Sequence, residues 1–170
     1  ESQVAEQFGV YPEEAFKPFA SYMTRGGKRI RGALTILGYE MYGGKDLDMI
    51  IDAAMAIEML QSYLLMMDDI QDRSETRRGG PTAHIMMRDY HKENHFRGDS
   101  LHFGESITMN SYLVGCHAAL ELITSLKVEP EILIKAIKNI HKSYITTAHG
   151  QTVDIFSEVV DSISEEDINN

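Results

Sequence analysis

Long apolar stretches without proline cover 47–72 and 99–126, and apolar residues after Pro130 recur at the spacing of one face of a helix. The alternation of apolar and polar residues that marks a half-buried strand is hardly seen. Only four prolines interrupt the sequence, and glycine pairs separate its apolar stretches. The pattern therefore predicts an all-α fold.

Proline, glycine and acidic residues place the ends of the expected helices. Pro12 suits a first helical turn and Glu13 and Glu14 suit the positive end of the helix dipole, so a helix should run from there to about Thr24. The chain then predicts helices over 28–42, 47–72, 99–126 and from 130 onward, a loop over 73–82 and an ambiguous polar stretch over 84–97. The third of these helices is dense in Met, Leu, Ile and Ala and should be buried on most sides.

The C-terminal part of the chain predicts one complete helix and the start of another. Apolar residues at helical spacing after Pro130 predict a core face made of Ile132, Leu133, Ala136, Ile137, Ile140 and Tyr144. Ser164 and Asp167 approximate a capping box at the start of a further helix. The chain stops at Asn170 before that helix could bury anything, so we expect the natural polypeptide to continue.

Length, charge and cysteine content narrow the class of protein. A chain of 170 residues can form one sizeable core, and we expect a single domain over 1–170. The formal charge of −10 argues against a nucleic-acid binder. No apolar run approaches the length of a membrane span, the N-terminal residues lack a signal-peptide pattern, and Cys116 should be a buried, reduced thiol. We therefore expect a cytoplasmic protein with no transmembrane segment.

Two aspartates one helical turn apart form the first candidate site. Asp68 and Asp72 should project from one face at the C-terminal end of their helix, where mutual repulsion and the helix dipole both disfavour them. Mg2+ is a suitable positive partner, because it takes oxygen ligands from one or two carboxylates and completes its shell with water and substrate phosphates. A solvated acidic helix end is the alternative.

Basic residues follow these aspartates directly. Arg73, Arg77 and Arg78 suit a diphosphate beside a bound metal, because guanidinium groups donate paired hydrogen bonds and stay charged at any relevant pH. Simple pairing of these arginines with the aspartates at the helix end is the alternative.

A second basic cluster lies upstream, in the segment RGGKRIRG at residues 25–32. Lys28 and Arg31 are three apart on an expected first helical turn, beside glycines that allow close approach of an anion. Cations beside glycine-rich turns and an aspartate pair, in an otherwise acidic chain, are the arrangement expected of phosphate sites. Several histidines nearby are not spaced as a ligand set and are expected at the surface: His84, His91, His95 and His102.

Three motifs together resemble a known family. GGKRIR at 26–31, DDIQDRSETRRGGPTAH at 68–84 and GQTVD at 150–154 are similar, in this order, to motifs of the trans-isoprenyl diphosphate synthases of the polyprenyl synthetase family. The resemblance implies an isoprenoid synthase helical bundle around a central cavity, usually as a homodimer. It also implies the Mg2+-assisted condensation of isopentenyl diphosphate with an allylic diphosphate (dimethylallyl, geranyl or farnesyl), with geranylgeranyl or farnesyl diphosphate as product.

The resemblance implies a role for each matching residue. Asp68 and Asp72 would hold Mg2+ against the allylic diphosphate, and Arg77 would contact that diphosphate. The isopentenyl diphosphate would be bound by Lys28, Arg31, Arg78 and Gln61. Gln151 and Asp154 match a motif that lines the cavity. Catalysis would then consist of positioning and Lewis acid chemistry, with no covalent nucleophile.

Bulky residues just before the first aspartate commonly limit product length in this family. Tyr63 and Leu64 stand five and four positions before Asp68, so Tyr63 could form the floor of the pocket and favour a C20 or C15 product. Ordinary packing in the helix core is an equal alternative for both side chains.

The chain departs from the family where a second aspartate-rich motif and a preceding Lys-Thr pair would follow GQTVD. We therefore expect the N-terminal part of a longer synthase, inactive by itself. Two other classes stay open, a non-catalytic or regulatory subunit of a prenyl synthase and a terpene cyclase. The intact charged motifs argue against the first, and the RRG and GGK elements argue against the second, because they serve a second diphosphate that a cyclase does not bind.

Overall fold

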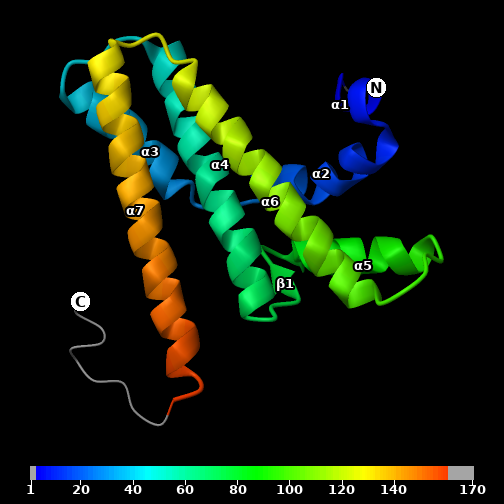
Figure 1. The fold of residues 1–170 in the computed structure, drawn as a ribbon. Coiled ribbons are helices and arrows are strands. Elements are labelled where there is room, and N and C mark those ends of the chain that lie inside the picture. Colours follow the sequence, from blue (N-terminus) through cyan, green and yellow to red (C-terminus); the bar gives the residue numbers. More distant parts are fainter. Residues whose placement is uncertain (1–2, 161–170) are drawn as a thin grey trace. The chain divides into compact units, whose positions relative to one another are not determined.

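The computed structural model describes residues 3–160, which form helices and one small hairpin (Figure 1). The contacts divide the chain into two units, Glu1–Leu126 and Lys127–Asn170. The first unit contains α1 (Gln3–Phe8), α2 (Val10–Thr24), α3 (Ile30–Met41), α4 (Leu47–Gln71), β1 (Thr76–Arg77), β2 (Gly80–Pro81), α5 (Ala83–Glu93) and α6 (Ser100–Thr124), and the second contains α7 (Pro130–Ser157). The all-α class is confirmed, and a single domain over 1–170 stays a prediction.

Most of the predicted helices begin where the sequence places them. Helices α2, α4, α6 and α7 start within two residues of the predicted positions. The stretch over 84–97, which was ambiguous, forms α5 in its first part. Helix α1 is absent from the prediction, because six residues are too few to show a helical period.

Helix α3 starts at Ile30, two residues later than predicted. Arg29 has a φ of 46°, in the left-handed region, so the helix cannot include it. The guanidinium of Arg29 donates to the backbone oxygens of Met23 at 2.6 Å and Arg25 at 2.9 Å, and these contacts turn the chain back on the end of α2. Lys28 therefore precedes the helix and Arg31 lies in its first turn.

Helix α4 lies at the centre of the first unit. The N-cap residue Asp46 accepts a hydrogen bond from the N–H of Met49 at 3.0 Å, which satisfies one free donor of the first turn. The helix contacts α2, α3, α5 and α6. Its buried residues extend from one end to the other: Ile50, Ala54, Ala56, Glu58, Leu60, Ser62, Tyr63, Met66 and Asp69. The predicted long core helix is confirmed.

By length and composition alone α4 could cross a membrane, since it has 25 residues and contains an 18-residue window with a mean hydropathy of 1.4. This finding corrects the expectation that no apolar run approaches the length of a membrane span. A core helix of a globular protein has the same composition, and α4 buries the polar side chains of Glu58, Ser62 and Asp69. Burial in the core accounts for part of its apolar character, since 39% of that window is buried.

Helix α3 packs closely on α4 at Gly32. The N–H of Gly32 donates to Oε1 of Glu58 at 2.8 Å, and a Cβ on Gly32 would lie 3.1 Å from Cγ of Glu58. The other Glu58 oxygen lies 3.4 Å from Nη1 of Arg29. This buried carboxylate therefore fixes the start of α3, next to Lys28 and Arg31.

Strands β1 and β2, in a segment predicted as a loop, form an antiparallel hairpin with Arg77 opposite Gly80. The two central residues, Arg78 and Gly79, have φ values of 51° and 75°, as in the mirror-image turns that match the twist of paired strands. Glycine adopts this conformation without penalty and arginine does not. Contacts of the Arg78 side chain must therefore hold the turn.

Helices α5 and α6 approach closely at Gly104 of α6. A Cβ on Gly104 would lie 2.9 Å from the backbone nitrogen of Arg88 and would overlap the backbone oxygen of His84. His84 and His91 are 3% and 4% exposed, so the expectation of surface histidines is wrong for both. They are buried because they lie on the side of α5 that faces α6, where the His91 ring packs on Phe103.

Helix α7 is the described helix of the second unit. It begins with Pro130 in its first turn and Glu131 one position later, as predicted. Gln151 and Asp154 are three residues apart on it, so they are neighbours on the helix surface. The core face of α7 stays a prediction, and the capping box predicted over 164–167 lies outside the described residues.

Gly104→Ala should lower the free energy of unfolding by about 1–3 kcal/mol, because the new Cβ meets backbone atoms that cannot move aside. Gly38→Ala is the matched control within α3, where a Cβ would meet nothing within 4 Å. It should raise that free energy by roughly 0.5–1 kcal/mol. Chemical denaturation of the complete natural polypeptide measures both changes. Equal effects of the two substitutions would contradict the close approach of α5 and α6.

Candidate diphosphate and metal site

Carboxylates gather at the C-terminal end of α4. The N–H of Asp72 donates to the backbone oxygen of Asp68 at 2.8 Å, so the two predicted metal ligands are one helical turn apart. Asp72 is exposed and makes no side-chain hydrogen bond or ion pair with any residue that the structure describes. The helix dipole and the neighbouring Asp68 both disfavour its charge. Its oxygens are therefore available to a cation.

Arg77 of β1 contacts two aspartates at once. Its Nη2 donates to Oδ2 of Asp68 at 2.8 Å, and its Nε donates to Oδ1 of Asp69. Burial alone would lower the pKa of Arg77, but the hydrogen bond to Asp69 and the charge of Asp69 outweigh it and raise that pKa. The structure thus shows the pairing of arginine with aspartate that the sequence left open as an alternative. The contact of Arg77 with a diphosphate stays a prediction.

Tyr22 of α2 binds the second oxygen of Asp69. The Tyr22 hydroxyl donates to Oδ2 of Asp69 and accepts from the N–H of Ala83 at 3.1 Å. Burial, and then the hydrogen bond to Asp69, raise the pKa of Tyr22, so the hydroxyl stays protonated at neutral pH. This buried network connects α2, the end of α4 and the start of α5.

Sequence reasoning missed Asp69 and Tyr22 as members of the site. Adjacent helical residues point roughly 100° apart, so Asp69 cannot share the face of Asp68 and Asp72. An aspartate on the buried side of an apolar helix is the signal that could have identified it. Nothing local marks Tyr22, because its partner is 47 positions away.

Arg78 connects the hairpin to the upstream basic segment. Its Nη1 donates to the backbone oxygen of Tyr22 at 3.1 Å. A Cβ on Gly27 would lie 3.2 Å from Cζ of Arg78, so glycine lets the guanidinium lie against the backbone. Arg25, from the same segment, donates to the backbone oxygen of Pro81. The two predicted basic clusters, far apart in the sequence, are therefore in contact.

The surroundings of Arg78 favour an anion. Burial, and then the positive charge of Arg29, hold the pKa of Arg78 below its usual value. Lys28 and Arg31 are exposed, and neither forms a side-chain hydrogen bond or ion pair within the described part of the chain. Gln61, the last residue predicted for this cluster, is half-buried on α4. Cations beside a glycine turn, with free N–H donors, suit a phosphate group.

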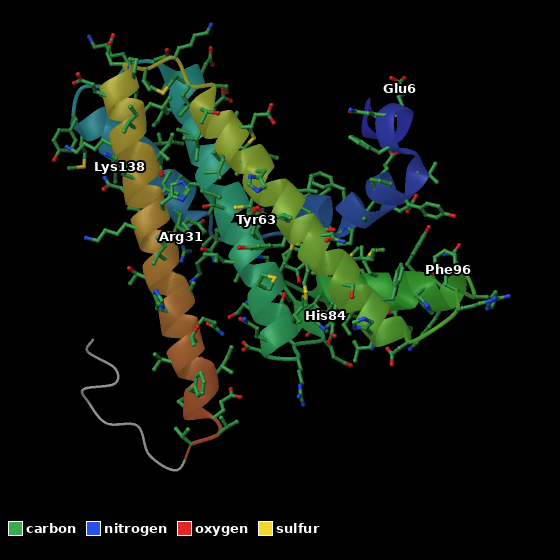
Figure 2. The ribbon with its side chains drawn as sticks, viewed as in Figure 1. Glu6, Arg31, Tyr63, His84, Phe96 and Lys138 are labelled. Carbon is green, nitrogen blue, oxygen red and sulfur yellow. The ribbon has the colours of Figure 1, made fainter. Side chains whose placement is uncertain are left out.

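Tyr63 lies in an aromatic cluster between α4 and its neighbours (Figure 2). Its ring centroid is 5.4 Å from that of Phe19 and 5.4 Å from that of Tyr112, and the residue is 0% exposed. Leu64 is half-buried. Nearby Cys116 is half-buried rather than fully buried, and burial raises the pKa of its thiol. The geometry of Tyr63 matches core packing, and the role of Tyr63 and Leu64 in product length stays a prediction.

A cavity of about 280 Å³ lies in the first unit and is lined in part by Phe96, which follows α5. Figure 2 labels Phe96. The cavity lining is mostly apolar and comprises Tyr11, Glu14, Ala15, Met87, Tyr90, Phe96, Phe103 and Ile107. None of the predicted site residues contributes to it. The central cavity therefore stays a prediction, as does the place of Gln151 and Asp154 in it, because both residues belong to the second unit.

Comparisons with known proteins agree with the motifs. The polyprenyl synthetase family model matches residues 13–170. The geranylgeranyl pyrophosphate synthase of Geoglobus acetivorans is 29% identical over 154 residues, which cover 91% of this chain and 43% of that protein. The geranylgeranyl diphosphate synthase of Methanosarcina mazei is also 29% identical over 154 residues, covering 91% of this chain and 42% of its own length.

Solved structures share the fold. The geranylgeranyl pyrophosphate synthase from Corynebacterium glutamicum, complexed with isoprenyl diphosphate and magnesium, superposes with a TM-score of 0.75 and 28% identity over 93% of this chain and 48% of that chain. The geranylgeranyl pyrophosphate synthetase from Geoglobus acetivorans superposes with a TM-score of 0.74 and 27% identity. The match covers 98% of this chain and 49% of that chain.

The fold and the aspartate and arginine motifs define a protein of the isoprenoid synthase class. The chain belongs to the polyprenyl synthetase family, which confirms the resemblance found in its motifs. It spans less than half the length of the relatives described above.

Gly27→Ala should weaken the binding of inorganic pyrophosphate, because the new Cβ, 3.2 Å from Cζ of Arg78, forces the guanidinium to shift by a few tenths of an ångström. We expect Kd to rise by about 3- to 10-fold, or ~0.7–1.4 kcal/mol. Gly26→Ala is the matched control, since a Cβ there would meet nothing within 4 Å. Its Kd should stay within about twofold of wild type. Calorimetry in the presence of Mg2+ measures both, and an equal loss in the two variants would contradict a role for the contact.

Proposed function

We propose that the complete natural polypeptide is a short-chain trans-prenyl diphosphate synthase. This transferase condenses isopentenyl diphosphate with an allylic diphosphate and releases geranylgeranyl or farnesyl diphosphate. The names of its relatives support this activity. The observation that carries the proposal is the contact of the two basic segments beside the aspartate end of α4.

Condensation of two diphosphates requires two anion sites side by side, so that the reacting carbons are held close together. Arg77 and Arg78 are adjacent in the chain but have different partners. Arg77 contacts Asp68 and Asp69, whereas Arg78 contacts the backbone of Tyr22 and lies against Gly27. We assign the Arg77 side to the allylic diphosphate. We assign the Arg78 side, with Lys28, Arg31 and Gln61, to isopentenyl diphosphate.

The donor set at the end of α4 fits Mg2+. Asp68 and Asp72 offer oxygen ligands one helical turn apart, and this ion needs only one or two carboxylates when substrate phosphates and water complete its shell. The part of the chain that the structure describes holds no group of three or more side chains placed to bind a metal. The carboxylate of Asp69 is bonded to Arg77 and Tyr22. Bound there, Mg2+ would neutralise the diphosphate and stabilise it as a leaving group.

The other two classes lack a specific supporting observation. A regulatory subunit would not need both Asp72 and Lys28 to be free of partners in the described part of the chain. A terpene cyclase binds one diphosphate. It would therefore not need two adjacent anion sites, one at Arg77 and one at Arg78. The family match also favours the synthase.

We also propose that the complete protein is a homodimer. The first part of helix α6 carries exposed apolar side chains that a partner subunit could bury: Leu101, Met109, Leu113 and Val114. Light scattering of the complete protein in solution tests this state. A monomer at all concentrations would reject it.

The proposed activity is tested by incubating the complete protein with labelled isopentenyl diphosphate, an allylic primer and Mg2+. We expect a C15 or C20 diphosphate product that disappears when a chelator is added.

Asp72→Asn should lower kcat roughly 100-fold or more, because it removes a charge that holds the metal. Asp48→Asn, at the exposed start of the same helix, is the control and should leave kcat within about twofold. A well-folded wild type that makes no prenyl product would reject the proposal.

Tyr63→Ala should lengthen the products, if the Tyr63 ring limits the growing chain. The same substitution should lower the free energy of unfolding by about 3–5 kcal/mol, because it leaves a void beside Phe19 and Tyr112. Chromatography of the dephosphorylated products measures chain length, and denaturation measures stability. A folded variant with an unchanged product distribution removes Tyr63 from the role and leaves it as a core residue.

A further inference from the structure

Arg77 is bound to two carboxylates that differ in their access to solvent. Asp68 is 33% exposed and also belongs to the predicted metal pair. Asp69 is 0% exposed and lies behind it. An exposed partner can be exchanged for another anion at small cost, whereas a buried charge that loses its partner is strongly destabilised. The bond from Arg77 to Asp68 can therefore be exchanged more easily than the bond to Asp69.

The bond to Asp69 uses the Nε of Arg77, and the bond to Asp68 uses Nη2. If Asp68 bound a metal, the Nη2 donor would be released while Nε would stay bound. The guanidinium would then keep its plane and present its Nη atoms as a fork, which is the geometry that matches a phosphate group. The orientation of these Nη atoms therefore depends on the hydrogen bond from Nε to Asp69 staying intact.

Tyr22 controls the orientation of Asp69. Its hydroxyl binds Oδ2, so that Oδ1 is left to face Arg77. The hydroxyl is itself held by the N–H of Ala83, and the cation of Arg25 lies 5.7 Å from the centre of the Tyr22 ring. The Tyr22 side chain is thus fixed from several sides in the core, where it is 1% exposed.

We propose that Tyr22 is a positioning residue that acts through Asp69 to hold the Arg77 guanidinium in the orientation that binds the allylic diphosphate. This inference rests on the proposed function and adds a residue to its machinery. Tyr22 also contacts Arg78, whose Nη1 donates to the Tyr22 backbone oxygen. This second contact does not involve the Tyr22 side chain. Loss of the hydroxyl should therefore affect one diphosphate site and leave the other unchanged.

Tyr22→Phe in the complete protein tests this separation. We expect the KM for the allylic diphosphate to rise about tenfold, with the KM for isopentenyl diphosphate within about twofold of wild type. Tyr39→Phe is the matched control, because it removes a hydroxyl that is hydrogen-bonded to the backbone of Asp46 at the other end of the first unit. It should change neither KM. Equal changes in both KM values for Tyr22→Phe would mean general loosening and would overturn the proposal.

A double-mutant cycle with Arg77→Ala shows whether Tyr22 acts through that arginine. In the Arg77→Ala background, Tyr22→Phe should produce no further rise in the KM for the allylic diphosphate. A full additional tenfold rise would show that Tyr22 acts by another route.

The wild-type protein supplies a measurement that needs neither turnover nor a stable variant. The Nε proton of Arg77, observed by nuclear magnetic resonance, should exchange slowly with solvent both in the free protein and with Mg2+ and inorganic pyrophosphate bound. Rapid exchange in the bound state would show that the bond to Asp69 breaks, and would overturn the inference. An absence of prenyl product rejects the proposed function and leaves this measurement valid, so the two failures can be distinguished.

Discussion

The buried carboxylate of Asp69 is the constraint on which the site in the first unit depends. A carboxylate taken out of water is costly unless both of its oxygens are bonded and its charge is paired. Tyr22 satisfies one oxygen and Arg77 satisfies the other along with the charge. Neither partner comes from α4 itself, so the chain must bring α2 and the hairpin to the end of this helix.

The second basic cluster follows from the same requirement. Once Arg77 is held on Asp69, the tight turn of the hairpin carries Arg78 toward the end of α2, where it meets the Tyr22 backbone and Gly27. The positive φ of Arg78 is tolerated because these contacts offset its cost. One buried ion pair thus places two cationic side chains next to each other with different surroundings. Two adjacent cationic side chains with separate surroundings fit the proposed reaction, which requires two diphosphates to be bound side by side.

Much of the fold could be predicted from local signals. Apolar periodicity and the positions of proline and glycine place the starts of α2, α4, α6 and α7 to within two residues, because helices depend on nearby residues. The late start of α3 and the hairpin could not be predicted, since Arg29 pairs with Glu58 and Arg78 bonds the backbone of Tyr22, both far away in the sequence. The buried histidines of α5 were missed for the same reason, because polarity in the sequence does not show which side of a helix a neighbour will cover.

The motifs identified the charged residues of the site, and they did not reveal how those residues are connected. Asp68 and Asp72 follow from helical spacing, whereas the link from Tyr22 through Asp69 to Arg77 joins three separate segments. A crystal structure of the complete protein with Mg2+ and pyrophosphate tests this connection most directly. The account predicts Asp68 and Asp72 on the metal, Arg77 Nε still bonded to Asp69, and the Arg77 Nη atoms on the pyrophosphate. A structure in which Arg77 leaves Asp69, or in which the metal binds away from the end of α4, would contradict it.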